Sequence, residues 1–254
     1  MKAGLVGYGK MGKILEGVLR GRGHDIVSVT DPFESCGIPS QPEKADVLIE
    51  FTRPDTAFDN IALAVSLGKP IVVGTTGWYE RLAEASAAVE SGGASLLWAT
   101  NFSLGVNLFY RIAAHAASVM DPFDEYDVAG FEVHHNKKAD SPSGTAETLV
   151  KQVLSSMKRK KKVLWDSPRG KMAPDTIHYA SLRVGSVPGT HSLVFDSPSD
   201  TIEISHSARN REGLASGAAL AAEWLVSCPG PGQPAGTPRR GIFTMDDVLK
   251  DMIG

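Results

Sequence analysis

The chain has 254 residues, 42% of them hydrophobic, which is enough for one large domain or two modest ones with a buried core. Its 26 basic and 29 acidic side chains give a net charge of -3, which argues against nucleic acid as a partner. Cys36 and Cys228 stand in no metal or redox spacing, and no apolar run approaches the ~20 residues that span a bilayer. Because Met1 leads almost directly into a strand-like run, leaving no room for a signal peptide, we expect a cytoplasmic protein without a membrane partner.

The first hundred residues alternate short apolar runs with helical patterns, a rhythm typical of βαβ units that build a parallel sheet. Between Asp31 and Lys44, the segment FESCGIPSQPEK holds two prolines and a glycine, which favour an irregular connection over a helix. The sequence therefore predicts an α/β fold whose N-terminal domain, residues 1–105, is Rossmann-type. The strands are expected at Ala3 to Val6, Ile26 to Thr30, Asp46 to Phe51, Pro70 to Val73 and Ser95 to Trp98.

The first turn of this domain carries a dinucleotide-binding pattern. The segment LVGYGKMGKIL places Gly7, Gly9 and Gly12 in a GxGxxG motif, which allows a tight turn, close approach of a pyrophosphate and packing of helix on strand. Asp31 ends the next strand, where a carboxylate accepts hydrogen bonds from a ribose diol. The alternative is a purely structural glycine turn. Because Pro32 and not an arginine follows Asp31, the pattern favours NADH over NADPH.

Two further loops fall at the carboxyl ends of predicted strands, where open α/β sheets bind their ligands. They are GTTGW at residues 74–78 and ATNFS at residues 99–103. Their small polar residues suit a nicotinamide ribose and amide. Each loop would equally serve as an ordinary strand-to-helix turn with a Thr or Ser cap.

Beyond about residue 105, strands follow one another with few helices between them, which predicts a smaller α+β domain with a mixed sheet over residues 106–212. The expected strands are Val128 to His134, His178 to Val184, Ser192 to Phe195 and Thr201 to Ser205, and the expected helices are Leu108 to Met120 and Thr145 to Met157. A helix at Gly213 to Val226, a Pro/Gly-rich linker at Pro229 to Gly241 and a helix at Met245 to Met252 return to the first domain. Residues 213–254 would thus complete it.

An anion site is predicted where the segment HHNKKADSPSGTA joins a strand to a helix. The helix start leaves backbone N–H groups unpaired, and Gly144 allows close approach to them. Ser143 and Thr145 add hydroxyl donors, and the helix dipole adds ~0.3 to 1 kcal/mol towards holding a carboxylate. Alternatively, Ser143 or Thr145 merely caps the helix while Lys137 and Lys138 are solvated. The adjacent histidine and lysine pairs favour the anion site.

The paired histidines raise the question of a metal. Consecutive strand residues point to opposite faces, so His134 and His135 do not easily share one ion, and no cysteine or suitably spaced third ligand lies nearby. We expect no metal, and hydrogen-bonding or acid/base roles for the histidines, whose titration lies near neutral pH.

These segments together resemble the bacterial 4-hydroxy-tetrahydrodipicolinate (dihydrodipicolinate) reductase family of the diaminopimelate route to lysine. HHNKKADSPSGTA is similar to that family's signature, and counterparts follow in order along nearly the whole chain. They are GYGKMG, FTRP, GTTG, the NFSLGVN run at Asn101 to Asn107, the RVGSVPGTH run at Arg183 to His191, ISHSARNR at Ile204 to Arg211, and GIFTMDDVL. Many members carry a longer glycine turn, and many place arginine where this chain has Pro32.

The resemblance implies reduction of 4-hydroxy-tetrahydrodipicolinate, via dihydrodipicolinate, to tetrahydrodipicolinate by hydride from NADH or NADPH, in a homotetramer. It implies His134 and Lys138 as catalytic residues, with Lys138 the proton donor. The implied substrate contacts are His135, Ser143, Gly144 and Thr145. The implied cofactor contacts are Gly7, Tyr8, Gly9, Lys10, Met11, Gly12, Asp31, Gly74, Thr75, Thr76, Ala99, Thr100, Asn101 and Phe102. Two alternatives stay open: an NAD(P)-dependent dehydrogenase of another small acid, and a non-catalytic nucleotide-binding regulatory protein.

Overall fold

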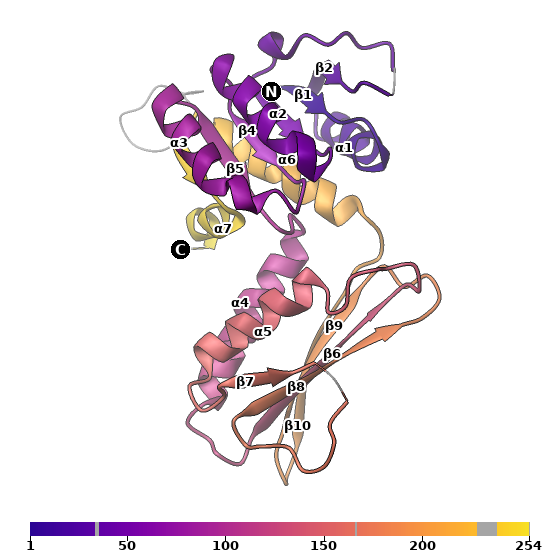
Figure 1. Ribbon diagram of the computed structural model, residues 1–254, viewed down its shortest axis with the longest axis vertical. Helices are drawn as coiled ribbons and strands as arrows, with labels where there is room; N and C mark the ends of the chain where they lie inside the picture. Colours follow the sequence, from indigo (N-terminus) through magenta and orange to yellow (C-terminus); the bar gives the residue numbers. More distant parts are fainter. Residues whose placement is uncertain (34–35, 166, 228–237, 254) are drawn as a thin grey trace. The chain divides into compact units, whose positions relative to one another are not determined.

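The computed structural model describes residues 1–33, 36–165, 167–227 and 238–253 (Figure 1). The chain divides into two compact units: unit 1 comprises Met1–Leu104 and Arg211–Gly254, and unit 2 comprises Gly105–Asn210. Across the described ranges, no helix is both long enough and apolar enough to cross a membrane.

Unit 1 is built on a six-stranded sheet whose paired strands all run parallel, in the order β11-β5-β4-β3-β1-β2. Its strands are β1 (Lys2–Val6), β2 (Asp25–Thr30), β3 (Val47–Glu50), β4 (Ile71–Val73), β5 (Ser95–Trp98) and β11 (Gly241–Phe243). The central strands are buried on both faces, as expected for a sheet covered by helices on both sides. The predicted Rossmann-type sheet and its five N-terminal strands are confirmed.

Helices cover both faces of this sheet. They are α1 (Lys10–Gly21), α2 (Pro54–Ser66), α3 (Leu82–Gly92), α6 (Glu212–Val226) and α7 (Met245–Ile253). Leu15 and Leu19 of α1 share one buried cluster with the alanine-rich side of α6, while Ile61 of α2 and Val89 of α3 belong to the cluster on the opposite face. Both α6 and α7 belong to unit 1.

The two proline-rich connections of unit 1 contain little regular structure. After Asp31, the described part of the connection holds only a 3-10 turn at Pro42–Lys44, as expected from its prolines. Most of the linker predicted at Pro229 to Gly241, and Cys228 before it, lie outside the described residues. The linker prediction was wrong at its end, because Gly241 begins β11, which pairs with β5.

Unit 2 holds a mixed five-stranded sheet in the order β10-β9-β6-β8-β7. Its strands are β6 (Asp127–His134), β7 (Lys162–Leu164), β8 (Thr176–Arg183), β9 (Thr190–Asp196) and β10 (Thr201–Ser207). β6 runs antiparallel to β9 and parallel to β8, so three separate segments of the chain meet around β6. The predicted mixed sheet is confirmed.

Two helices, α4 (Leu104–Met120) and α5 (Gly144–Ser156), supply the apolar cover of this sheet (Figure 1). Leu149, Val150 and Val153 of α5 are fully or almost fully buried, together with Phe109 of α4 and Tyr179 of β8. The apolar stripe predicted for α5 therefore faces the sheet, and it fixes the start of α5 beside the end of β6.

The basic run at residues 158–162 contains a buried lysine. Lys162 opens β7, and the side chain of Lys160 is only 1% exposed. Lys160 Nζ lies 2.5 Å from Asp127 Oδ1 and donates to the carbonyl oxygen of Pro174 at 2.7 Å. A buried ammonium is stable only with such partners. Lys160 is therefore structural.

Candidate active site

The glycine turn of unit 1 opens onto a pocket of about 460 Å³. The residues that line it come from the ends of β1, β3 and β4 and from the start of α1: Gly9, Lys10, Met11, Phe51, Thr52, Pro54, Gly74, Thr75 and Thr76. Six of these nine were predicted as cofactor contacts. Phe51, Thr52 and Pro54 of the FTRP segment were not.

Each glycine of the motif has a geometric reason. Gly7 has φ +93°, and a Cβ atom there would overlap the carbonyl oxygen of Phe51. A Cβ atom at Gly12 would overlap the carbonyl oxygen of Gly7, whereas one at Gly9 would meet nothing within 4 Å. Among the described residues, no side chain caps α1 at Gly9. Gly9, Lys10 and Met11 line the pocket, so the start of α1 borders it, as expected for an anion-binding helix start.

Asp31 lies beside this turn. Its Oδ2 accepts a hydrogen bond from the backbone N of Tyr8 at 2.6 Å, and its Oδ1 accepts one from the backbone N of Phe33 at 2.8 Å. Of the predicted contacts in the loop after β5, Ala99 and Phe102 are buried and do not line the pocket. The structure thus brings the turn and the Gly74 loop to one pocket but does not add residues 99–102 to its lining.

A buried carboxylate that the sequence analysis missed lies beneath this pocket. Glu50 is fully buried, and its Oε1 accepts hydrogen bonds from the Thr52 hydroxyl, the Thr75 hydroxyl at 2.9 Å and the Thr52 backbone N at 3.0 Å. Burial raises the pKa of Glu50 although these donors oppose it. In the sequence, the one sign of this buried carboxylate is an acidic residue inside the apolar run VLIEF. Glu50 ties together two of the loops that line the pocket.

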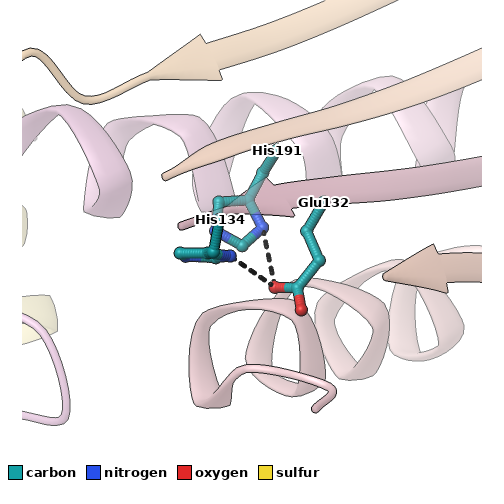
Figure 2. A group of neighbouring side chains, drawn as sticks. All are labelled: Glu132, His134 and His191. Atoms are coloured by element: carbon teal, nitrogen blue, oxygen red, sulfur yellow. Dashed lines mark ion pairs between the residues drawn. The ribbon is translucent and has the colours of Figure 1, made fainter. Parts of the chain in front are cut away.

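In unit 2, the predicted catalytic His134 lies in a buried polar cluster with Glu132 and His191 (Figure 2). The Nδ1 atoms of His134 and His191 lie 3.5 and 3.8 Å from Glu132 Oε2. The two imidazole rings are 5.2 Å apart in an edge-on arrangement. Burial lowers the pKa of both histidines, that of His191 to about 4. Both imidazoles are therefore mostly neutral at neutral pH.

Further donors surround the Glu132 carboxylate. Oε1 accepts hydrogen bonds from Ser181 Oγ at 2.9 Å, Ser143 N at 3.0 Å and Arg183 Nη2 at 3.1 Å, and Oε2 accepts one from the Ser143 hydroxyl. Burial alone would raise the pKa of Glu132, but these donors hold it below its usual value. Glu132, Ser181, Arg183 and His191 were not predicted as site residues, because three different strands bring them together.

The predicted substrate contacts lie around the start of α5. Ser143 is buried and caps α5, accepting a hydrogen bond from Ala146 N at 3.1 Å. Ser143 therefore serves as the cap of α5, and its hydroxyl donates to Glu132. Gly144 is exposed with open space around it, Thr145 is half-buried, and His135 follows the end of β6. Gly144 and Thr145 are thus left at the accessible part of the helix start.

Lys138 has an acidic partner that the sequence analysis did not single out. Its Nζ lies 2.7 and 2.8 Å from the two carboxylate oxygens of Asp140. Arg183 Nη2 donates to the carbonyl oxygen of the same Asp140 at 2.7 Å. The loop that carries Lys138 is thereby tied to β8.

A third possible metal ligand does lie near His134, contrary to the expectation from the sequence. One donor atom from each of Glu132, His134 and His191 lies within 4.8 Å of the others. The Glu132 carboxylate already accepts hydrogen bonds from Ser143, Ser181 and Arg183, so a metal would compete with them. The absence of a metal stays a prediction.

Comparisons with known proteins match both units. The model of the dihydrodipicolinate reductase N-terminus matches residues 1–102, and that of the dihydrodipicolinate reductase C-terminus matches residues 105–249. The chain is also 38% identical, over 253 residues, to the 4-hydroxy-tetrahydrodipicolinate reductase of Christiangramia forsetii, covering 99% of both chains.

The chain belongs to the dihydrodipicolinate reductase family. The sequence-based predictions of this family, of an NAD(P)H-dependent oxidoreductase, and of 4-hydroxy-tetrahydrodipicolinate reductase activity in diaminopimelate and lysine biosynthesis are confirmed.

Solved structures show the same fold. A dipicolinate-bound dihydrodipicolinate reductase from Paenisporosarcina sp. TG-14 superposes with a TM-score of 0.74 at 21% identity, covering 96% of this chain and 97% of that one. Aspartate semialdehyde dehydrogenase II from Vibrio cholerae gives a TM-score of 0.51 at 10% identity, covering 89% of this chain and 98% of that one. The fold is thus shared with other dehydrogenases.

Proposed function

We propose that unit 1 binds the nicotinamide dinucleotide and that unit 2 binds the substrate and supplies the proton. The pocket at the glycine turn supports the first assignment, because an open helix start and the Asp31 carboxylate lie together there. The second rests on Lys138 and His134, which lie at the carboxyl end of β6 just before the start of α5. Bound NAD(P)H would supply the hydride.

In this proposal Lys138 protonates the ring as the imine is reduced. Its ammonium is a donor without acceptor capacity, and the negative charge that develops on hydride addition requires a proton from the protein. The buried His134, neutral because burial lowers its pKa, orients or relays that proton. General-acid assistance of this kind is typically worth ~10² to 10⁴ in rate.

The substrate carboxylates would bind at the start of α5. Gly144, Thr145 and the first N–H groups of α5 offer an accessible anion site, and His135 adds a donor next to it. The Paenisporosarcina relative binds dipicolinate, a planar dicarboxylate, which is the class of ligand such a site would hold. Ser143 takes part indirectly, by capping α5 and contacting Glu132.

NADH is the favoured cofactor. The Asp31 carboxylate at the end of β2 suits a ribose diol, whereas a 2′-phosphate would be repelled by it. The test is the ratio of kcat/KM for NADH to that for NADPH in the wild-type protein and in Asp31→Asn. We expect the ratio to exceed one in the wild type and to fall in the variant. A wild type that prefers NADPH would contradict this assignment.

The reaction itself is tested by mixing the protein with NADH and the freshly made condensation product of pyruvate and aspartate semialdehyde. Loss of nicotinamide absorbance that depends on all three components is expected. His134→Ala should bind NADH as the wild type does but turn over more slowly, because His134 belongs to unit 2. Full activity in His134→Ala would remove it from the catalytic residues.

We further propose a cytoplasmic homotetramer in which unit 2 provides the contacts. β10 forms an edge of the five-stranded sheet and exposes most of its residues. Light scattering on the purified protein should give about four times the chain mass of 27.0 kDa.

A further inference from the structure

Glu132 is fully buried, yet it carries a negative charge between three strands and a helix. A buried carboxylate is strongly destabilising unless donors surround it. Here donors reach it from Ser143 at the start of α5 and from Ser181 and Arg183 on β8, while His191 on β9 faces it. An apolar residue at this position would avoid the free-energy cost of removing a charge from water. The placement therefore calls for a role beyond packing.

The carboxylate faces the same atom, Nδ1, of two imidazoles (Figure 2). His134 Nδ1 makes no hydrogen bond to the described residues and lies 3.5 Å from Glu132 Oε2, so the nearby negative charge favours the form of His134 that carries its proton on Nδ1. The Nε2 atom is then left as an acceptor. Gly189, with φ +155°, passes this side of the ring, and a Cβ atom there would lie 2.9 Å from Nε2. A glycine at this position avoids that overlap with Nε2.

The same carboxylate is linked to the proposed proton donor. Arg183 Nη2 donates both to Glu132 Oε1 at 3.1 Å and to the carbonyl oxygen of Asp140 at 2.7 Å. The Asp140 carboxylate in turn holds Lys138. A change at Glu132 therefore reaches His134 directly and Lys138 through three contacts, by way of Arg183 and Asp140.

We propose that Glu132 is a positioning residue of the reductase: its carboxylate fixes the Nδ1-protonated form and the orientation of His134, and through Arg183 it holds the Lys138 loop. This inference rests on the proposed catalytic roles of His134 and Lys138. Glu132 itself need not touch the substrate, because its oxygens are all directed at protein donors.

The charge of Glu132 also acts on the titration of His134. Burial lowers the pKa of His134, the charges of Lys138 and Arg183 lower it further, and those of Glu132 and Asp140 raise it. Removing the Glu132 charge therefore leaves a His134 that is protonated only at lower pH. The groups that face His134 from β6, the loop, β8 and β9 are Glu132, Lys138, Asp140, Arg183 and His191.

The decisive variant is Glu132→Gln in the full-length chain, which keeps the shape of the side chain and removes its charge. We expect kcat to fall by about 10- to 100-fold with a smaller change in the KM for substrate, because the reacting groups lose their alignment. The limb of the kcat–pH profile that reports His134 should move to lower pH. Ser181→Ala, which removes one donor to Glu132 but keeps the charge, should leave that limb in place.

A second readout does not depend on activity. In the protein labelled with ¹⁵N-histidine, the ring-nitrogen shifts of neutral His134 should show the proton on Nδ1 in the wild type and a mixture of both forms in Glu132→Gln. If Glu132→Gln does not fold, Glu132→Asp replaces it, and kcat should fall without movement of the limb. A wild-type His134 protonated on Nε2, or an unchanged limb in a folded Glu132→Gln, would overturn the proposal.

Failure of the proposed catalytic roles would look different. If His134→Ala kept the wild-type kcat, His134 would not be catalytic, whereas the spectrum of wild-type His134 would still report whether Glu132 selects its protonated nitrogen. A different outcome is a slow His134→Ala together with a wild-type His134 that is protonated on Nε2 and a kcat–pH profile that does not move in Glu132→Gln. In that case only the proposed role of Glu132 is rejected.

Discussion

The Nζ atom of Lys138 lies 2.7 Å from Asp140 Oδ1, two residues further along the same loop. The side chain of Lys138 is 21% exposed and that of Asp140 is 59% exposed, so the ion pair faces solvent. A pair of this kind contributes little to stability. Its significance is that the proposed proton donor is held in one place yet stays accessible.

We predict that Lys138→Ala lowers kcat by ~10² to 10⁴ while the KM for NADH stays within a few-fold, because the proton donor is lost and unit 1 is unchanged. Steady-state kinetics with the pyruvate and aspartate semialdehyde condensation product measures this. Lys137→Ala is the matched control, since Lys137 is its exposed neighbour. Equal kcat values for Lys138→Ala and the wild type would remove Lys138 from the mechanism.

The glycine motif offers a second pair of variants. A Cβ atom at Gly9 would enter the open space of the pocket, so Gly9→Ala should keep the melting temperature but weaken NADH binding at least about 10-fold. A Cβ atom at Gly12 would overlap the Gly7 carbonyl oxygen, so Gly12→Ala should lower the free energy of unfolding by about 1 to 3 kcal/mol. NADH titration and thermal unfolding separate the two effects. Wild-type affinity in Gly9→Ala would argue against a pyrophosphate at this turn.

Sequence patterns were enough for the elements whose signal is local. The glycine motif, the apolar runs of β1 to β5 and the apolar stripe of α5 each follow from a few neighbouring residues. His134, Lys138 and the start of α5 come from one short segment, so their proximity could also be predicted. β11 was missed because its pairing with β5 comes from residues far apart in the chain.

The rest of the site depends on the order of strands in the sheet. Glu132 meets Arg183 and His191 only because β6 lies between β8 and β9, and no periodicity in the sequence specifies that order. Glu50 and Lys160 are charged residues in buried positions, whose partners likewise come from other elements. Interior charges were therefore the features least accessible to sequence reasoning.

The buried His191 predicts acid sensitivity. Burial lowers its pKa from 6.5 to about 4, so the unfolded chain binds more protons than the native one between these values. The stabilisation is complete above pH ~6.5 and is lost as the pH falls towards ~4, by at most about 1.4 kcal/mol per pH unit. Urea unfolding over this range should show a shallower loss in His191→Asn than in the wild type. The same substitution at the exposed His115 should leave the slope unchanged, and equal slopes for wild type and His191→Asn would refute the assignment.

Glu50 should act in the opposite direction. Burial raises its pKa above the ordinary 4.5, so the native chain binds more protons than the unfolded one, and stability is lost as the pH rises from about 4.5 through the raised value. Glu50→Gln can still accept from Thr52 and Thr75 without carrying a charge, and it should remove this loss. The measurement is the difference in free energy of unfolding between variant and wild type from about pH 4 to pH 8. That difference should grow with pH for Glu50→Gln and stay flat for Glu90→Gln, whose side chain is exposed. A flat difference at Glu50 would mean that the hydrogen bonds from Thr52 and Thr75 balance the effect of burial, and a difference that falls with pH would mean that they outweigh it; either result would contradict the prediction.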